Sequence, residues 1–325
     1  MKFQFLLLAT LLLAPSAQQA TGVKSVDARD VLERMGTDFD APRLGVPRPI
    51  QAKTVARELA AGTEAELDAE AERRRRAAAS AKLESILRGQ LRIEATAPGD
   101  AKWLRVSEDG ALTASLDAAE QARLDELLAC MRAFDKLVMI EARYVELPKA
   151  AARKLGIDAT STLATMEERD VLLESLMSEG ADMLSSPRVL MQPLQQASLY
   201  VGDVVNYVED WSVLTVEPGG TEVLDPRIME VRLGTFLVAR AVPLPADKLS
   251  LSLEIGHATI AKPLRTSRVQ LGSREVEVAL PEISNQRVQI ELTVAPKATT
   301  LLPIPSEGDR MLLVFVTADV VPESK

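Results

Sequence analysis

The stretch RVQIELTV, from Arg287 to Val294, alternates polar and aliphatic residues at every step. Successive side chains of a β-strand point to opposite faces, so the aliphatic residues share one face and the polar residues line the other. The aliphatic set is Val288, Ile290, Leu292 and Val294. This pattern predicts a strand of an antiparallel sheet that packs one face on a core and exposes the other face to water.

The chain around this stretch continues the strand pattern. Strand-like runs separated by Gly and Pro are SLYVGDVVNYV, RIMEVRLGTFLVARAV, KLSLSLEIGHATI, REVEVAL and RMLLVFVTADVV. The run MLLVFV is apolar on both faces, which places it inside a sheet. Alternation along the second run predicts one shared face made of Met229, Val231, Leu233, Leu237 and Ala239, with Thr235. The chain after Gly180 is therefore predicted to be mainly antiparallel β.

The segment LSSPRVLMQPLQQASLYVGDVVNYV, from Leu184 to Val208, has the pattern of a β-hairpin. Its first strand would turn at Pro193, and the strand that returns would begin at Leu199. Gly202 interrupts the returning strand. We expect Gly202 and Gly234 either to mark bulges or close approaches of two strands, or to be ordinary turn or strand-end glycines.

The first half of the chain carries the helix signals. Each predicted helix begins with a residue that can cap it and a Glu three positions later, as in a capping box. The pairs are Thr63 with Glu66, Asp117 with Glu120, and Thr165 with Glu168. Gly89 would stop the first helix. The second helix has one apolar stripe, formed by Leu124, Leu127, Leu128 and Met131.

Short strands surround the second helix. LRIEAT, from Leu91 to Thr96, alternates like a strand, and WLRVSEDGALTASL reads as two strands joined at Asp109-Gly110. KLVMIEARYVEL, from Lys136 to Leu147, reads as a long strand. A helix packed on a small sheet buries both apolar faces, so this part is predicted to be a small αβ domain.

The composition limits the partners of the chain. It has 325 residues, 38 Lys+Arg and 47 Asp+Glu, for a net charge of −9. An acidic chain does not favour general binding of nucleic acid, which needs basic surface. The run Arg73–Arg76 follows several acidic residues, so we favour a solvated helix face over a binding patch.

The segment from Ala41 to Ile50 contains three prolines, and this predicts an extended connector.

The N-terminus resembles a signal peptide. Lys2 precedes an apolar run from Phe3 to Ala14, which is the length of a signal-peptide core. We therefore expect residues 1–20 to direct export and to be removed; an uncleaved membrane anchor is the alternative. No cysteine follows the run, so no lipid anchor is expected there, and no later segment reads as a transmembrane helix.

The sequence predicts no catalytic, cofactor-binding or metal site. His257 is the single histidine, and it lies near the end of a strand on the apolar face, which favours a structural role over catalysis. Glu141 and Glu146 are five positions apart on a strand and so lie on opposite faces, unlike an acid/base pair. The chain is therefore predicted not to be an enzyme.

The remaining distinctive side chains have ordinary structural interpretations. Cys130 is the single cysteine, so no disulfide within the chain is possible, and we expect a small buried residue on a helix. Trp103 and Trp211 could anchor an interface, but we favour packing in a core.

Several of these segments resemble the secretins, ring-forming outer-membrane channels of bacterial secretion and pilus systems. The strand from Val138 to Glu146 and the KLGI that follows it resemble the start of the secretin β-domain. Leu184-Ser185-x-Pro187-Arg188, LGTFLVARAV, KLSLSLEIG and LLVFVTADVV resemble later family segments in the family's order. The helix Ala118–Ala133 with its strands resembles the small ring-building domain that precedes the β-domain. The resemblance spans about residues 25–325.

One part of the sequence departs from the secretin pattern. Secretins have a strand ending in Gly-Gly, then a long amphipathic lip and a Pro-rich hairpin. Here the sixteen residues from Ala295 to Arg310 connect two strands without a Gly-Gly pair. A membrane-crossing hairpin needs two strands of about 9–11 residues each, so this connector predicts that the lip is missing.

Together these observations predict an α+β protein. Its expected parts are a signal peptide (1–20), a linker and helical segment (21–90), a small αβ domain (91–135) and a mainly antiparallel, secretin-like β-domain (136–325). The resemblance implies a non-enzymatic structural component of a secretion or pilus apparatus, which forms a homo-oligomeric ring in the periplasm or outer membrane. It also implies other secretion-system envelope proteins as partners, and it leaves membrane contact open. The alternative is a monomeric periplasmic scaffolding or binding module without a pore.

Overall fold

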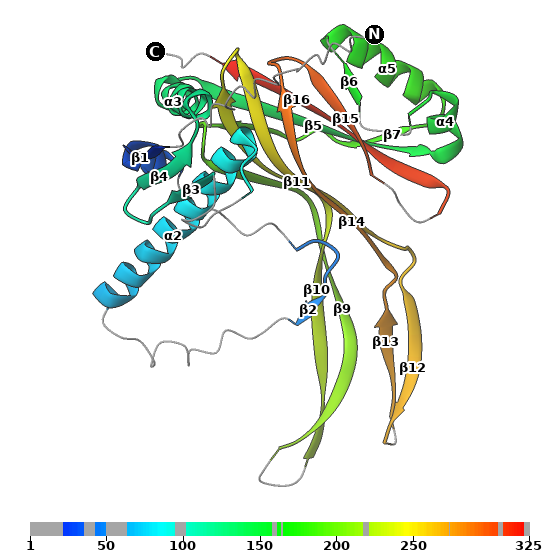
Figure 1. Ribbon diagram of the computed structural model, residues 1–325. Coiled ribbons are helices and arrows are strands. Elements are labelled where there is room, and N and C mark those ends of the chain that lie inside the picture. The colour runs from blue at the N-terminus through cyan, green and yellow to red at the C-terminus, as the bar shows by residue number, and fades with distance from the viewer. Residues whose placement is uncertain are drawn as a thin grey trace, which may run out of the picture.

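The computed structural model describes residues 22–35, 43–49, 64–94, 102–157, 161–163, 165–216, 221–272, 274–304 and 308–321. The predicted signal peptide, Thr63 of the first capping pair and the ends of the proline-rich connector (41–42 and 50) lie outside these residues. The described chain is α+β with mainly antiparallel sheets, as predicted. Figure 1 shows a small αβ unit beside a body of two crossed sheets, from which two hairpins project.

The small αβ unit contains a sheet in the order β1-β4-β3 and three helices. The strands are β1 (Gly22–Asp27), β3 (Trp103–Val106) and β4 (Ala111–Leu116). The helices are α1 (Arg29–Arg34), α2 (Glu64–Leu91) and α3 (Ala118–Ala133). β1 and α1, from the segment that the sequence assigns to a linker, pair and pack within this unit.

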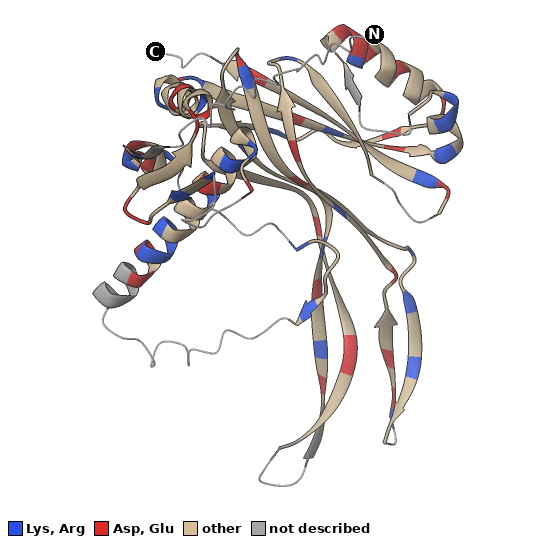
Figure 2. Ribbon diagram, viewed as in Figure 1, with Lys and Arg blue, Asp and Glu red and all other residues tan. Residues whose placement is uncertain are grey.

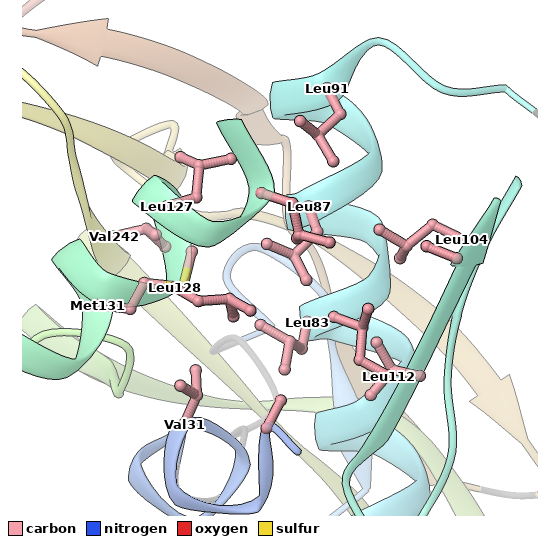
Figure 3. Packing of buried hydrophobic residues seen from close by; sticks show 14 of the residues in the cluster. Val31, Leu83, Leu87, Leu91, Leu104, Leu112, Leu127, Leu128, Met131 and Val242 are labelled. Carbon is pink, nitrogen blue, oxygen red and sulfur yellow. The ribbon is translucent and has the colours of Figure 1, made fainter. Parts of the chain in front are cut away.

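The core of the small unit is aliphatic. Leu83 and Leu87 of α2 face Leu127 and Leu128 of α3, and Leu104 of β3 closes the side, as Figure 3 shows. The predicted capping box of α3 is present, because Asp117 accepts from the Glu120 N–H while the Glu120 side chain accepts from the Asp117 N–H. The predicted stripe on this helix is buried.

Arg34 of α1 forms hydrogen bonds with the C-terminal end of α3. Arg34 Nη1 donates to the carbonyl oxygens of Met131 (2.6 Å) and Arg132 (3.0 Å), and its Nη2 donates to that of Phe134 (2.6 Å). These carbonyls have no partner inside the helix, and a cation is favoured at a helix C-terminus. The contact therefore fixes α1 against the end of α3.

Helix α2 corrects two predictions. It continues past Gly89 to Leu91, and the strand predicted from Leu91 is wrong, because the described residues 92–94 form no strand. Leu91 and Ile93 are buried in the core, which explains an alternation that resembled a strand. The run Arg73–Arg76 is exposed, and three of its arginines pair with Glu70 and Glu72 on the same helix, as expected of a solvated face.

The first sheet of the body, here sheet I, has the order β6-β15-β16-β5, with β7 and β8 both paired to the outer side of β5. Its strands are β5 (Leu137–Pro148), β6 (Ser161–Leu163), β7 (Asp182–Ser185), β8 (Arg188–Met191), β15 (Thr299–Ile304) and β16 (Arg310–Val321). The helices beside it are α4 (Lys149–Lys154) and α5 (Met166–Ser178). β16 holds the MLLVFV run, and its middle is buried as predicted.

The second sheet, here sheet II, has the order β14-β11-β10-β9. Its strands are β9 (Gln196–Val216), β10 (Thr221–Leu244), β11 (Lys248–Ile260) and β14 (Ile283–Val294), with the short β2 (Arg48–Pro49) beside β10. A separate hairpin, β12 (Arg265–Leu271) and β13 (Arg274–Leu280), lies between β11 and β14 in the chain. No described helix has the length and apolar character needed to span a membrane.

The two sheets enclose the main core. Side chains of β5 and β16 pack on those of β10, β11 and β14. Tyr144 of β5 is fully buried there, and its hydroxyl donates to the carbonyl oxygen of Phe236 on β10 at 2.5 Å. The other face of sheet I is covered by α5, whose Leu173 and Leu176 are buried against it.

The connector Ala295–Arg310 contains a strand, β15, that its sequence pattern does not indicate. β15 pairs with β16 on one side and with β6 on the other. Its residues TTLLPI do not alternate, because Thr299, Thr300 and Leu301 are all buried between α5 and the main core. A strand that is buried on both faces lacks the alternation by which a half-buried strand is recognised in a sequence.

The hairpin predicted for Leu184–Val208 is wrong. β8 pairs with β5 in sheet I, and β9 pairs with β10 in sheet II, so the two strands belong to different sheets. The chain turns at Leu194, which has a positive φ of 70° and is fully buried, with its N–H bonded to the Ala241 carbonyl at 2.8 Å. Pro193 does start a turn, but the turn is a corner between layers.

Gly202 and Gly234 mark a close approach of β9 and β10. The two glycines lie directly opposite each other, without a register shift at this point. A Cβ at Gly202 would lie 2.9 Å from the Gly234 Cα, and a Cβ at Gly234 would lie 2.6 Å from the Gly202 Cα. Gly234 also has φ +120°, which L side chains rarely adopt.

This approach changes which residues share a face of β10. Met229, Val231 and Leu233 pack with Phe236, in a cluster separate from the one that holds Leu237 and Ala239. The prediction of one continuous face through Thr235 is therefore wrong. The backbone leaves the extended region at Gly234, so the alternation restarts there.

Candidate functional site: the two free edges of sheet II

Sheet II ends in two strands that have an open edge. Among the described residues, β9 pairs with β10 alone and β14 pairs with β11 alone. All neighbouring strands in this sheet are antiparallel, so β9 and β14 run in opposite directions. If a second copy stood beside the first in the same orientation, its β9 would meet β14 antiparallel.

The core face of sheet II is incomplete at both edges. β14 alternates as its sequence predicts, with Val288, Ile290 and Leu292 half-buried and the polar residues between them exposed. On the opposite edge, Ala197 of β9 is also half-buried against the same core. Edge strands with open N–H and C=O groups and aliphatic neighbours are prone to pair with another chain.

Beyond Gly202 and Gly234, β9 and β10 continue as a projecting hairpin, and β12 and β13 project beside it (Figure 1). The two hairpins contact each other through Trp211, whose indole N–H donates to the Glu277 carbonyl of β13 at 2.9 Å. Val276 and Val278 of β13 are buried. Several aliphatic side chains on the hairpins stay exposed, namely Val204, Val213, Leu214, Val223, Ile228 and Val269.

A buried carboxylate lies on the α5 face of sheet I. Oε1 of Glu141 accepts from Arg143 Nε (2.9 Å), from Arg188 Nε and Nη2 (3.1 and 3.0 Å) and from Ser186 Oγ (3.2 Å). Its Oε2 accepts from Arg169 Nη1 at 3.5 Å. Burial opposes the charged form, but the bonds from Arg143 and Arg188 outweigh it and lower the pKa of Glu141.

This cluster could not be recognised in the sequence. Glu141 and Arg143 come from β5, Arg169 from α5 and Arg188 from β8. Asp170 completes it, because it accepts from Arg169 Nε at 2.9 Å and from Arg143 Nη1 at 3.4 Å. The arginines lie far apart in the chain, so no spacing rule could have indicated that they meet.

The residues singled out in the sequence are not brought together. Glu141 and Glu146 lie on opposite faces of β5. Trp103 is buried at 8% exposure, whereas Trp211 is half-buried on the hairpin. Cys130 is half-buried on α3. The described residues contain no group of three or more His, Cys, Asp or Glu that could hold a metal ion.

His257 lies near the end of β11, close to the point where the hairpins leave the body. It hydrogen-bonds to the Gly234 backbone, and its Nδ1 has no partner within the described chain. Burial lowers the pKa of His257 below the usual 6.5, although the Glu146 carboxylate and the Gly234 contact oppose this. The neutral ring is therefore the form that the fold favours.

This depressed pKa predicts a pH dependence. Just below pH 6.5 the unfolded chain binds more protons at His257 than the folded chain, so stability falls as the pH is lowered through this window. We expect His257→Gln to remove that slope, which urea unfolding at pH 7.5 and 5.5 would measure. Because the chain has one histidine, NMR titration of its ring protons checks the site directly. A folded-state pKa above 6.5 would contradict the prediction.

No protein-family model matches the chain, and no curated protein matches it. Solved structures that it resembles include the V. cholerae type IV competence pilus secretin PilQ, with 16% identity, TM-score 0.29, and coverage of 68% of this chain and 70% of that one.

Two further structures align over a similar share. The InvG secretin domain of the Salmonella SPI-1 injectisome has 13% identity and a TM-score of 0.30, with 74% of this chain and 80% of that one covered. The E. coli K12 type II secretion system secretin GspD has 13% identity and a TM-score of 0.31, with 74% and 60% covered. All three solved structures are secretins, the family that the sequence motifs resemble.

Proposed function

We propose that this chain is a secretin-like envelope protein whose copies join side by side, through β14 of one and β9 of the next, into a ring. It would act as a non-enzymatic structural component of a bacterial secretion or pilus apparatus, exported to the periplasm or the outer membrane. Other envelope proteins of the same apparatus would be its partners.

The two open edges of sheet II carry this proposal. A contact between two different edges is heterologous, and repeating it makes a ring when the rotation closes. Pairing β14 with a neighbouring β9 would satisfy the open backbone groups of both edges. It would also place Ile290 and Leu292 beside Ala197 of the neighbour, so that the core face would continue from one copy to the next.

A charge placed on the core side of β14 tests the proposal. We expect Ile290→Lys to reduce the oligomeric fraction about tenfold or more, because the new ammonium would be desolvated between two copies. In a single copy position 290 is only half-buried, so the fold should tolerate a lysine that reaches water. Mass photometry and negative-stain microscopy of detergent-extracted protein measure the outcome.

Gln289→Lys is the matched control, since it adds the same charge to the exposed face of the same strand. It should leave the oligomer intact. If wild-type protein is a monomer under all conditions, the ring is wrong and the monomeric scaffolding module is favoured. If Ile290→Lys and Gln289→Lys behave alike while wild type is oligomeric, the copies use a surface other than the edges of sheet II.

A further inference from the structure

The cluster around Glu141 holds more positive than negative charge. The guanidinium groups of Arg143, Arg169 and Arg188 share the carboxylates of Glu141 and Asp170. Figure 2 shows acidic and basic residues along the strands of sheet I and on α5 beside them. One arginine is enough to compensate a buried glutamate. In this cluster three guanidinium groups thus share two carboxylates.

Arg188 is both oriented and exposed. Its Nε and Nη2 are bonded to Glu141, whose side chain is 7% exposed, yet 60% of the Arg188 side chain faces solvent. A guanidinium that is already held in one orientation loses little conformational freedom when it binds a carboxylate. This arginine is thus prepared to receive an anion from outside.

Exposed aliphatic side chains flank Arg188. Leu190 lies two residues along β8, on the same face of the sheet, and is 54% exposed. Met183 of β7 is 43% exposed and pairs with Val145, which places it on the same α5 face as Arg188. Arginine and methionine are enriched at protein interfaces relative to the rest of the surface.

We propose that this face, here the Arg188 face (Met183, Arg188 and Leu190), binds an acidic segment of another protein. A carboxylate of the partner would meet Arg188, and its apolar side chains would cover Leu190 and Met183. The aliphatic neighbours favour a peptide over a nucleic acid, whose backbone offers them no apolar surface. The face belongs to sheet I and points away from the core, so it does not include the edges of sheet II, and the proposal is independent of ring formation.

A pair of designed peptides tests the proposal. The probe is a short capped peptide of alternating valine and glutamate with a neutral fluorophore, and its counterpart has lysine at every glutamate. Fluorescence anisotropy with the full chain should show binding of the acidic peptide alone, weakened by added salt. Arg188→Glu should weaken it about tenfold or more. Glu141 keeps Arg143 and Arg169 as partners, so this variant should still fold.

Arg227→Glu is the matched control, because Arg227 is also 60% exposed and also pairs with a glutamate, but lies on the β9–β10 hairpin. It should change the affinity less than about twofold. Leu190→Ser should weaken binding at unchanged salt dependence, which separates the apolar contribution from the charge. Equal binding of both peptides, no binding of the acidic one, or equal losses in Arg188→Glu and Arg227→Glu would each overturn the proposal.

Discussion

Gly234→Ala is expected to lower the free energy of unfolding by more than about 3 kcal/mol. The added methyl group would collide with the carbonyl oxygen of Val201 and lie 2.6 Å from the Gly202 Cα. The φ of +120° adds backbone strain. Neither neighbour is a flexible side chain, so β9 and β10 would have to separate where the projecting hairpin leaves the body. Urea unfolding followed by circular dichroism measures the loss.

Gly272→Ala provides the matched control. Gly272 also has a positive φ, of 61°, but a Cβ there would meet no atom within 4 Å. Its substitution should cost only the strain of an alanine in the left-handed backbone region, about 1 kcal/mol. Equal costs for the two substitutions would mean that backbone conformation alone, and not the close approach of the strands, requires glycine at position 234.

Glu141→Gln is expected to have the next largest effect, about 3 kcal/mol at neutral pH. The amide keeps the shape of the side chain but removes its charge, which leaves Arg169 (side chain 6% exposed) and Arg143 to share Asp170. A buried cation that loses its carboxylate is strongly destabilising. Chemical denaturation of both proteins at pH 7 measures the difference.

The sign of the pH dependence provides a second measurement on the same variant. Because the pKa of Glu141 is lowered, its charged form contributes stability above the ordinary value of 4.5 and loses it as the pH falls through the folded-state value. The difference between wild type and Glu141→Gln should therefore shrink in acid. Glu146→Ala, on the same strand but with a partly exposed ion pair to Arg310, should cost less than about 1 kcal/mol. A Glu141→Gln cost no larger than this control would contradict the prediction.

Elements whose signals are local were predicted well from the sequence. The capping boxes at Asp117 and Thr165 begin α3 and α5, and the alternation of RVQIELTV marks β14. A cap satisfies backbone groups within four residues, and alternation reports the burial of one face, so both can be read without knowing the rest of the fold.

Elements that depend on distant partners were misread. Residues 184–208 have the pattern of a hairpin, but Leu194 carries the chain from sheet I to sheet II. Leu91 and Ile93 resemble strand residues, but Leu91 is the last residue of α2 and Ile93 follows that helix. Both are buried in the core of the small αβ unit. A short apolar pattern shows that a residue is buried, and it does not show which neighbour buries it.

The sequence by itself determined that the second half is antiparallel β and that one face of β14 is apolar, because both properties follow from the order of side chains along a strand. Only the tertiary structure decided that β9 and β14 are the two edges of one sheet that no described strand covers. It also decided that Gly202 and Gly234 lie opposite each other, and that Arg143, Arg169 and Arg188 surround Glu141. Strand pairing and the burial of a charge are decided by segments that meet after long loops have closed, and the local sequence does not encode which segments those are.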